Sequence, residues 1–218
     1  MTKVFPNAVS SSSSSSSSST PSSSSSSSSS DYIDQTVLTV WKKSMLLNCD
    51  GFTVFNATGN LVYRVDNYIA GNKGEILLMD AAGNPVFTIR RKRLRLALAD
   101  SWVVYEGETG VNPRFSARKN VLNRLKSKRL ARVEVEGSSG MGMGMYDIEG
   151  CYGKRCCAVY DEKRRLVAEI KRKEAAGGMI FGMDVFRLLV HPQIDTAIAM
   201  ALLILLDQMF GSSSYPSF

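Results

Sequence analysis

A dense run of basic side chains is the best candidate for a functional site in this sequence. Five residues in six positions are basic: Arg90, Arg91, Lys92, Arg93 and Arg95. The run follows a β-rich apolar segment, so we expect several of these side chains to project at one rim of a sheet. Such a cluster gains about 1 kcal/mol per residue near an anionic membrane, which predicts a lipid- or anion-binding site. Two other interpretations stay open, a solvated strand end and a nuclear-import signal.

The positive charge of the chain is concentrated around this basic run. Residues 90–132 contain thirteen basic and three acidic residues, while the segments before and after carry net charges of −1 and −2. A second basic cluster in this segment consists of Arg124, Lys126, Lys128, Arg129 and Arg132. The pattern predicts an anionic partner. Specific nucleic-acid binding is not expected, because no aromatic residues alternate with the basic ones.

Side chains suited to catalysis are scarce. His191 is the only histidine, and no visible partner would orient it, so we expect a structural residue at a strand end. Asp161 and Glu162 fit a turn better than a metal site. The sequence contains no hydrolase, metalloprotease or nucleotide-binding motif. We therefore expect a non-enzyme without catalytic residues or cofactors.

The chain has four cysteines: Cys49, Cys151, Cys156 and Cys157. They show no C-x-x-C spacing, and the adjacent Cys156 and Cys157 would point to opposite faces of a strand. We expect reduced, partly buried thiols and no metal, although a zinc site that includes His191 is an alternative. Reduced thiols, and no recognisable targeting segment, predict a cytoplasmic protein. Plasma-membrane association and a nuclear location are the alternatives that stay open.

An apolar helix near the C-terminus must be enclosed by other parts of the chain. Ten of the eleven residues from Thr196 to Leu206 are apolar, and they leave no polar stripe. A membrane span needs roughly 20 such residues, so we expect burial in protein and no transmembrane segment. Pro192 is expected at the first helical position, and Gly211 in the left-handed conformation that ends the helix.

One hairpin pattern occurs three times and predicts strands around that helix. Its copies are Phe52–Val65, Ile76–Ile89 and Cys156–Ile170. Each has Asn or Asp at the turn entry, and the first two have glycine before the second strand. This predicts a side chain that caps backbone amides, followed by a residue with positive φ. Arg164 replaces the glycine in the third copy, so we expect that turn to be strained or built differently.

Together with further short alternating runs, the hairpins amount to about a dozen strands, and a sheet of that size usually curls or closes. We therefore predict a mainly β fold, a closed antiparallel barrel of about twelve strands around the C-terminal helix. Residues 31–210 form this single domain, with 137–144 as a flexible loop. Residues 1–30, which include a serine tract, are expected to be disordered, and residues 211–218 to form a short tail.

Several long stretches resemble the plant LURP-one-related (LOR) family, which belongs with tubby C-terminal domains and phospholipid scramblases. In order, they are Leu38–Ser44, Phe52–Tyr68, Leu78–Asp80, Phe87–Arg91, Ala158–Lys163, Val167–Lys173 and His191–Phe210. The resemblance implies a tubby-like barrel of twelve strands around a hydrophobic helix, and it supplies no catalytic residues. It also implies a membrane-tethered regulator that binds phosphoinositides. The alternatives are a protein-interaction scaffold in plant defence or stress signalling and, with less support, phospholipid scrambling.

Overall fold

The computed structural model describes residues 35–43, 51–68, 75–92, 101–111, 113–119, 129–135, 144–174 and 182–211. The predicted disordered segment 1–30, most of the predicted loop at 137–144 and the tail after Gly211 lie outside these residues. Cys49, Arg93 and Arg95 lie outside them as well. The predicted domain organisation therefore stays a prediction.

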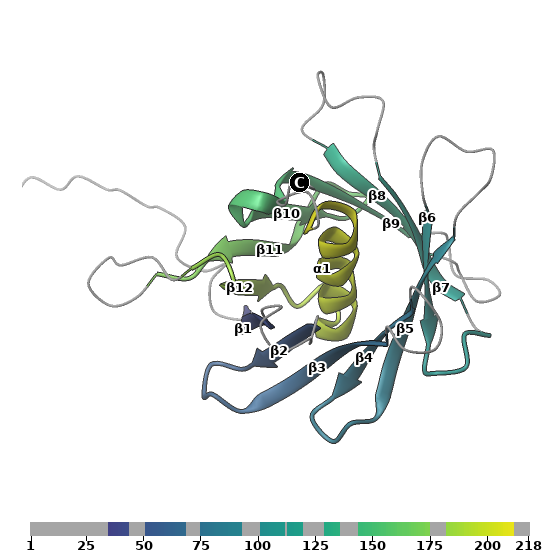
Figure 1. Cartoon of the computed structure of the whole chain (residues 1–218). Helices are drawn as coiled ribbons and strands as arrows, with labels where there is room; N and C mark the ends of the chain where they lie inside the picture. The colour runs from purple at the N-terminus through teal and green to yellow at the C-terminus, as the bar shows by residue number, and fades with distance from the viewer. Residues whose placement is uncertain are drawn as a thin grey trace, which may run out of the picture. The chain divides into compact units, whose positions relative to one another are not determined.

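Twelve antiparallel strands form a closed barrel, as the sequence predicted (Figure 1). Each strand pairs with its neighbours in the chain, and β1 closes the barrel against β12. The strands are β1 (Thr36–Lys43), β2 (Gly51–Phe55), β3 (Leu61–Tyr68), β4 (Glu75–Asp80), β5 (Pro85–Lys92), β6 (Ser101–Glu106), β7 (Pro113–Lys119), β8 (Arg129–Val135), β9 (Met145–Cys151), β10 (Cys156–Tyr160), β11 (Leu166–Arg172) and β12 (Val185–Val190). Alternate residues face the interior, as Leu38 and Val40 of β1 do.

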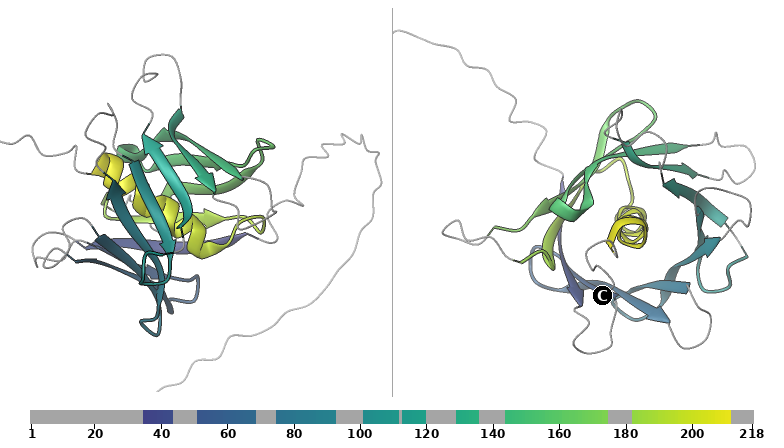
Figure 2. Two further views of the ribbon diagram at one scale, coloured as in Figure 1. Left: turned by 90° about the vertical axis from the view of Figure 1, so that its right-hand side faces the viewer. Right: turned by 45° about the horizontal axis from the view of Figure 1, so that its top comes forward.

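Helix α1 (Thr196–Phe210) lies inside the barrel, and the right-hand view of Figure 2 shows the strands around it. Met200, Leu203 and Ile204 are among its ten buried side chains, although they lie on different sides of the helix. Burial of such a side chain stabilises a fold by about 1.5–3 kcal/mol, so the helix supplies much of the core. Within the described ranges, no helix has the length and apolar character needed to cross a membrane.

Both predicted ends of this helix were wrong. Asp195, rather than Pro192, lies at the N-terminal boundary, and its carboxylate accepts hydrogen bonds from the backbone N–H groups of Ala197 and Ile198. The side chain thereby provides acceptors for two backbone N–H groups that have no partner within the first turn of a helix. At the other end, Gly211 has a right-handed backbone with φ of −73°. Gly211 therefore does not supply the predicted left-handed residue.

The three predicted hairpins are present and share one kind of turn. Their capping residues are Asn56, Asp80 and Asp161. Each accepts a hydrogen bond from the backbone N–H four positions later, at 2.8 to 2.9 Å. The residue three positions after the cap has positive φ, 84° at Gly59, 91° at Gly83 and 60° at Arg164. A left-handed backbone is unfavourable for a residue with a Cβ atom. The third turn is therefore not built differently, and Arg164 adopts the conformation that glycine has in the other two.

Candidate functional site

Strand β5 extends through Lys92, so the first three residues of the basic run are part of the strand and do not follow it. Successive side chains of a strand point to opposite faces. Arg91 shares the inner face with the core residue Ile89, and its guanidinium lies 5.6 Å from the ring centroid of Trp102. Arg90 and Lys92 face outward. Arg91 and Lys92 are both exposed at the end of β5, but alternation places Arg91 on the opposite side of the wall from Arg90 and Lys92. The predicted binding site as a whole stays a prediction.

Arg90 already contacts other side chains on the outside of the barrel. Its Nη2 atom donates a hydrogen bond to Glu75 Oε1 at 3.0 Å, and its guanidinium lies 5.5 Å from the ring centroid of Tyr105. The turn after β6 packs on the same group, because a Cβ atom at Gly110 would overlap it. An anion that bound Arg90 would therefore compete with an existing ion pair and a cation–π contact.

Two inward cations of β1 and β7 contact the C-terminal turn of α1. Lys119 Nζ donates to the backbone oxygen of Met209 at 2.7 Å and lies 4.6 Å from the ring centroid of Phe210. Lys42 Nζ lies 2.7 Å from Asp207 Oδ1. Positive charge is stabilising at this end, where the last carbonyl groups of a helix carry partial negative charge. These cations hold the helix, a role that a count of charges along the sequence did not reveal.

Lys92 belongs to a row of residues that crosses six strands in register. We name this row the outer rung, and it consists of Lys92, Ser101, Arg118, Arg132, Asp147 and Tyr160. The sequence neighbours Ala117 and Val133 are core residues, so the rung lies on the outer face. Lys92 and Arg118 are exposed, and no hydrogen bond or ion pair joins either of them to another described residue.

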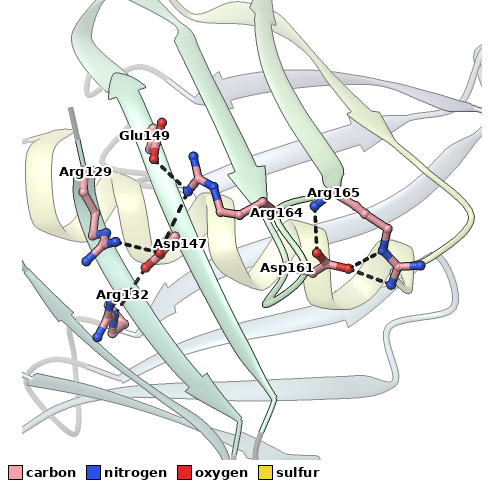
Figure 3. A network of polar contacts seen from close by, with 7 residues as sticks. All are labelled: Arg129, Arg132, Asp147, Glu149, Asp161, Arg164 and Arg165. Atoms are coloured by element: carbon pink, nitrogen blue, oxygen red, sulfur yellow. Dashed lines mark hydrogen bonds and ion pairs between the residues drawn. The ribbon is translucent and has the colours of Figure 1, made fainter. Parts of the chain in front are cut away.

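Three arginines surround Asp147 in the outer rung (Figure 3). Arg129 Nη2 lies 2.9 Å from Asp147 Oδ2, and Arg132 Nε lies 3.3 Å from Oδ1. Arg164 Nη1 lies 4.0 Å from Oδ2 and donates to Glu149 Oε1 at 2.9 Å. The arginine side chains are 34 to 54% exposed, whereas that of Asp147 is only 8% exposed. Since three guanidinium groups face two carboxylates, the cluster retains positive charge and has exposed N–H groups.

Arg164 extends this positive surface from the turn between β10 and β11. Its guanidinium lies 4.5 Å from the ring centroid of Tyr160, the last residue of the outer rung. The hydrogen bond to Glu149 raises the pKa of Arg164 above its ordinary value, so the charge is permanent. Guanidinium groups bind phosphate through paired N–H donors. The exposed donors of this face can therefore bind a ligand that carries several phosphates.

The residues considered for catalysis take structural positions. His191 directly follows β12, and its Nε2 atom lies 3.1 Å from Gln35 Nε2. Asp161 caps its turn and pairs with Arg165, and the neighbouring Glu162 is exposed. Across the described part of the chain, no group of three His, Cys, Asp or Glu side chains could hold a metal ion.

The described cysteines lie at the junction of β9 and β10. Cys156 is exposed and Cys157 is buried, as their adjacent positions in a strand predicted. Cys151 is also exposed, and all three thiols are free.

Comparison with known proteins gives one consistent result. A family model described as "LURP-one-related" matches residues 36–207. Protein LURP-one-related 8 of Arabidopsis thaliana is 53% identical over 180 residues, which cover 81% of this chain and 88% of that protein. Protein LURP-one-related 17 of the same plant is 44% identical over 186 residues, covering 81% and 84%. A solved structure of an Arabidopsis thaliana protein matches with a TM-score of 0.58 at 19% identity, covering 80% of this chain and 91% of that one, which supports the fold.

Proposed function

Because this chain belongs to the LURP-one-related family, we propose that it is a non-catalytic binding module that attaches to anionic membranes through its outer rung. One observation carries the proposal: cations of the outer rung on β5, β7 and β8, together with one from the β10–β11 turn beside it, lie on the outside of the barrel wall and exceed the acidic groups beside them. They are Lys92, Arg118, Arg132 and Arg164. Phosphoinositides suit this face, because their head groups offer several phosphates to guanidinium donors.

The expected affinity divides into two parts. A cation near an anionic leaflet gains about 1 kcal/mol, so four of them supply at most roughly 4 kcal/mol. That energy corresponds to a dissociation constant of about 1 mM. Direct hydrogen bonds from the guanidinium groups to phosphate must supply the rest, which favours head groups with several phosphates over singly charged lipids.

The test is flotation of the full chain with neutral vesicles and with vesicles that contain a phosphoinositide, at low and at physiological salt. We expect binding to the phosphoinositide vesicles at both salt concentrations. The double variant Lys92→Gln/Arg118→Gln should lose this binding without loss of stability, because neither side chain pairs with another described residue.

The matched control removes two exposed charges outside the outer rung, Lys154→Gln and Arg187→Gln. It lowers the net charge by the same amount and should retain binding. If the two double variants bind equally well, the outer rung is not the contact surface. If the wild-type chain floats with neither kind of vesicle, membrane attachment is wrong.

A protein-interaction scaffold in plant defence or stress signalling is the second candidate, and one observation favours it. Trp41 of β1 is 51% exposed, and its ring lies 6.0 Å from that of Phe55. Exposed aromatic side chains are typical anchors of protein interfaces. Trp41→Ser should then abolish partner binding and leave vesicle flotation unchanged. Phospholipid scrambling has less support, because α1 would have to leave the core to enter a bilayer.

A further inference from the structure

Cys151 and Cys156 are direct partners across two antiparallel strands. Cys151 ends β9, Cys156 begins β10, and their Cα atoms are paired in the register of the two strands. Paired Cα atoms in such strands are about 4.5–5.5 Å apart. Disulfides connect Cα atoms that are about 4.4–6.8 Å apart. The backbone spacing therefore suits a disulfide without movement of either strand.

The two thiols also lie on the same face and are accessible. Residues paired across antiparallel strands direct their side chains to the same side of the sheet. Both cysteines are exposed and free. Each thiol can therefore meet both a small oxidant in the solvent and the other thiol.

The neighbouring thiol, Cys157, is buried and barely contacts the solvent. It belongs to the buried core on the opposite face of β10. Burial, together with the nearby thiols of Cys151 and Cys156, raises the pKa of Cys157 to about 12. Because the thiolate is the reactive form, Cys157 stays inert while its exposed neighbour reacts.

We propose that Cys151 and Cys156 form a reversible disulfide when hydrogen peroxide reaches the barrel. The thiolate of one cysteine attacks a peroxide oxygen, the O–O bond breaks, and a sulfenic acid and water result. The second thiolate attacks the sulfenic sulfur, the S–S bond forms, and the hydroxide that leaves takes up a proton. Two electrons pass from the thiols to the peroxide, so two thiols and one peroxide give one disulfide and two waters. A dithiol reductant reverses the reaction.

The loop that this disulfide would close contacts α1. Residues 152–155 lie between the two cysteines, and the Tyr152 hydroxyl donates to Asp207 Oδ1 of the helix at 2.9 Å. The Arg155 guanidinium lies 4.3 Å from the ring centroids of both Tyr152 and Phe186. A covalent bond across the loop limits its opening. Oxidation should therefore strengthen the contact between the barrel wall and the last turns of α1.

Peptide mapping of the full chain under non-reducing conditions tests the disulfide. Trypsin cleaves after Lys154 and Arg155, so the disulfide would appear in mass spectrometry as two linked peptides that separate on reduction. We expect this species after treatment with one equivalent of peroxide, within a monomer on a non-reducing gel. Thiols that stay free, or a disulfide between two chains, would overturn the proposal.

Single variants assign the disulfide to its two cysteines. Cys157→Ala should keep the linked peptides, and Cys151→Ser and Cys156→Ser should lose them. The two serine variants replace exposed side chains and should fold normally. A disulfide that survives in Cys156→Ser and disappears in Cys157→Ala would assign the reaction to the buried thiol and contradict the proposal.

Hydrogen exchange tests the coupling to the helix. Amides in the last two turns of α1 should exchange several-fold more slowly in the oxidised chain than in the reduced chain. Cys156→Ser, treated with peroxide in the same way, should show no such change. Equal exchange rates in the oxidised and reduced wild-type chain would refute the coupling.

Discussion

Arg164 illustrates how one side chain can compensate for an unfavourable backbone. The corresponding position is glycine in the other two hairpins, and Arg164 adopts their left-handed conformation with φ of 60°. Its guanidinium lies over the Tyr160 ring and donates to Glu149. These contacts offset the backbone strain, and they also place a charged group beside the outer rung.

Two substitutions separate the strain at Arg164 from its contacts. Arg164→Gly loses the contacts and relieves the strain, whereas Arg164→Ala loses the contacts and keeps the strain. We expect Arg164→Ala to have the lower Tm in thermal unfolding, by about 2–4 °C for each kcal/mol of strain. Equal Tm values would show that the left-handed backbone is not strained.

Asp80 makes the second hairpin sensitive to acid. Hydrogen bonds from the Asn84 side chain and then from the Asn84 backbone lower the pKa of Asp80 below its ordinary value of 3.8. The folded chain thus favours the carboxylate. The resulting stability is fully present above the unfolded pKa and is lost as pH falls through the lower, folded pKa.

Urea unfolding at pH 7 and at pH 3 measures this contribution. The wild-type midpoint should fall on acidification by more than that of Asp80→Asn, which cannot ionise at this position. Asn56 plays the same role in the first hairpin, so asparagine fits such a turn. Identical acid sensitivity in the two chains would mean that Asp80 has no part in it.

The helix and the barrel depend on each other at the scale of elements. The barrel keeps an all-apolar helix from water, and α1 fills an interior that twelve strands would otherwise leave empty. The N-terminal end is capped by Asp195, and the C-terminal turn is held by Lys42 and Lys119. Side chains on every side of the segment from Ala199 to Leu206 therefore belong to the core.

Leu203 tests this dependence because it is 1% exposed in the middle of α1. Leu203→Ala should lower the free energy of unfolding by about 2–5 kcal/mol, measured by urea titration with circular dichroism. Leu203→Asp should prevent folding, because it buries an unpaired charge. Gln208→Ala, an exposed position of the same helix, should change the free energy by less than about 0.5 kcal/mol. A folded Leu203→Asp chain would contradict the buried helix.

At the scale of the molecule, the cations on the described strands take three kinds of position relative to the barrel wall. Inward cations such as Lys119 hold the end of the helix, and outward cations of the outer rung face solvent. Arg90 also points outward, but it forms an ion pair with Glu75 and a cation–π contact with Tyr105. Cations that are close in sequence thus serve different purposes.

Arg90→Gln distinguishes these roles. It removes the ion pair with Glu75 and the contact with Tyr105, so the free energy of unfolding should fall by about 1 kcal/mol. Flotation with phosphoinositide vesicles should stay near the wild-type level, since Arg90 is not part of the outer rung. Lost flotation with unchanged stability would instead make Arg90 a lipid contact.

The barrel and its helix could be predicted from local sequence patterns. Strand periodicity, the three repeated turns and an all-apolar segment too short for a membrane are local patterns, and each favours one structure whatever surrounds it. Glycine and asparagine at fixed turn positions report backbone conformation directly, which is why the left-handed backbone at Arg164 was predictable. The predicted helix ends were wrong because proline and glycine are compatible with a helix boundary but do not require one. At the N-terminal end, the hydrogen bonds that Asp195 accepts set the boundary.

Which cations share a surface could not be predicted from the sequence, because strand register sets it. A run of basic residues does not show where its strand ends or how that strand pairs with its neighbours. A shift of one residue in the register would place each side chain on the opposite face of the wall. Lys92, Arg118 and Arg132 are far apart in the chain and meet through strand register. The pairing of Cys151 with Cys156 has the same origin. Register depends on the closure of all twelve strands around the helix, so no local pattern could supply it.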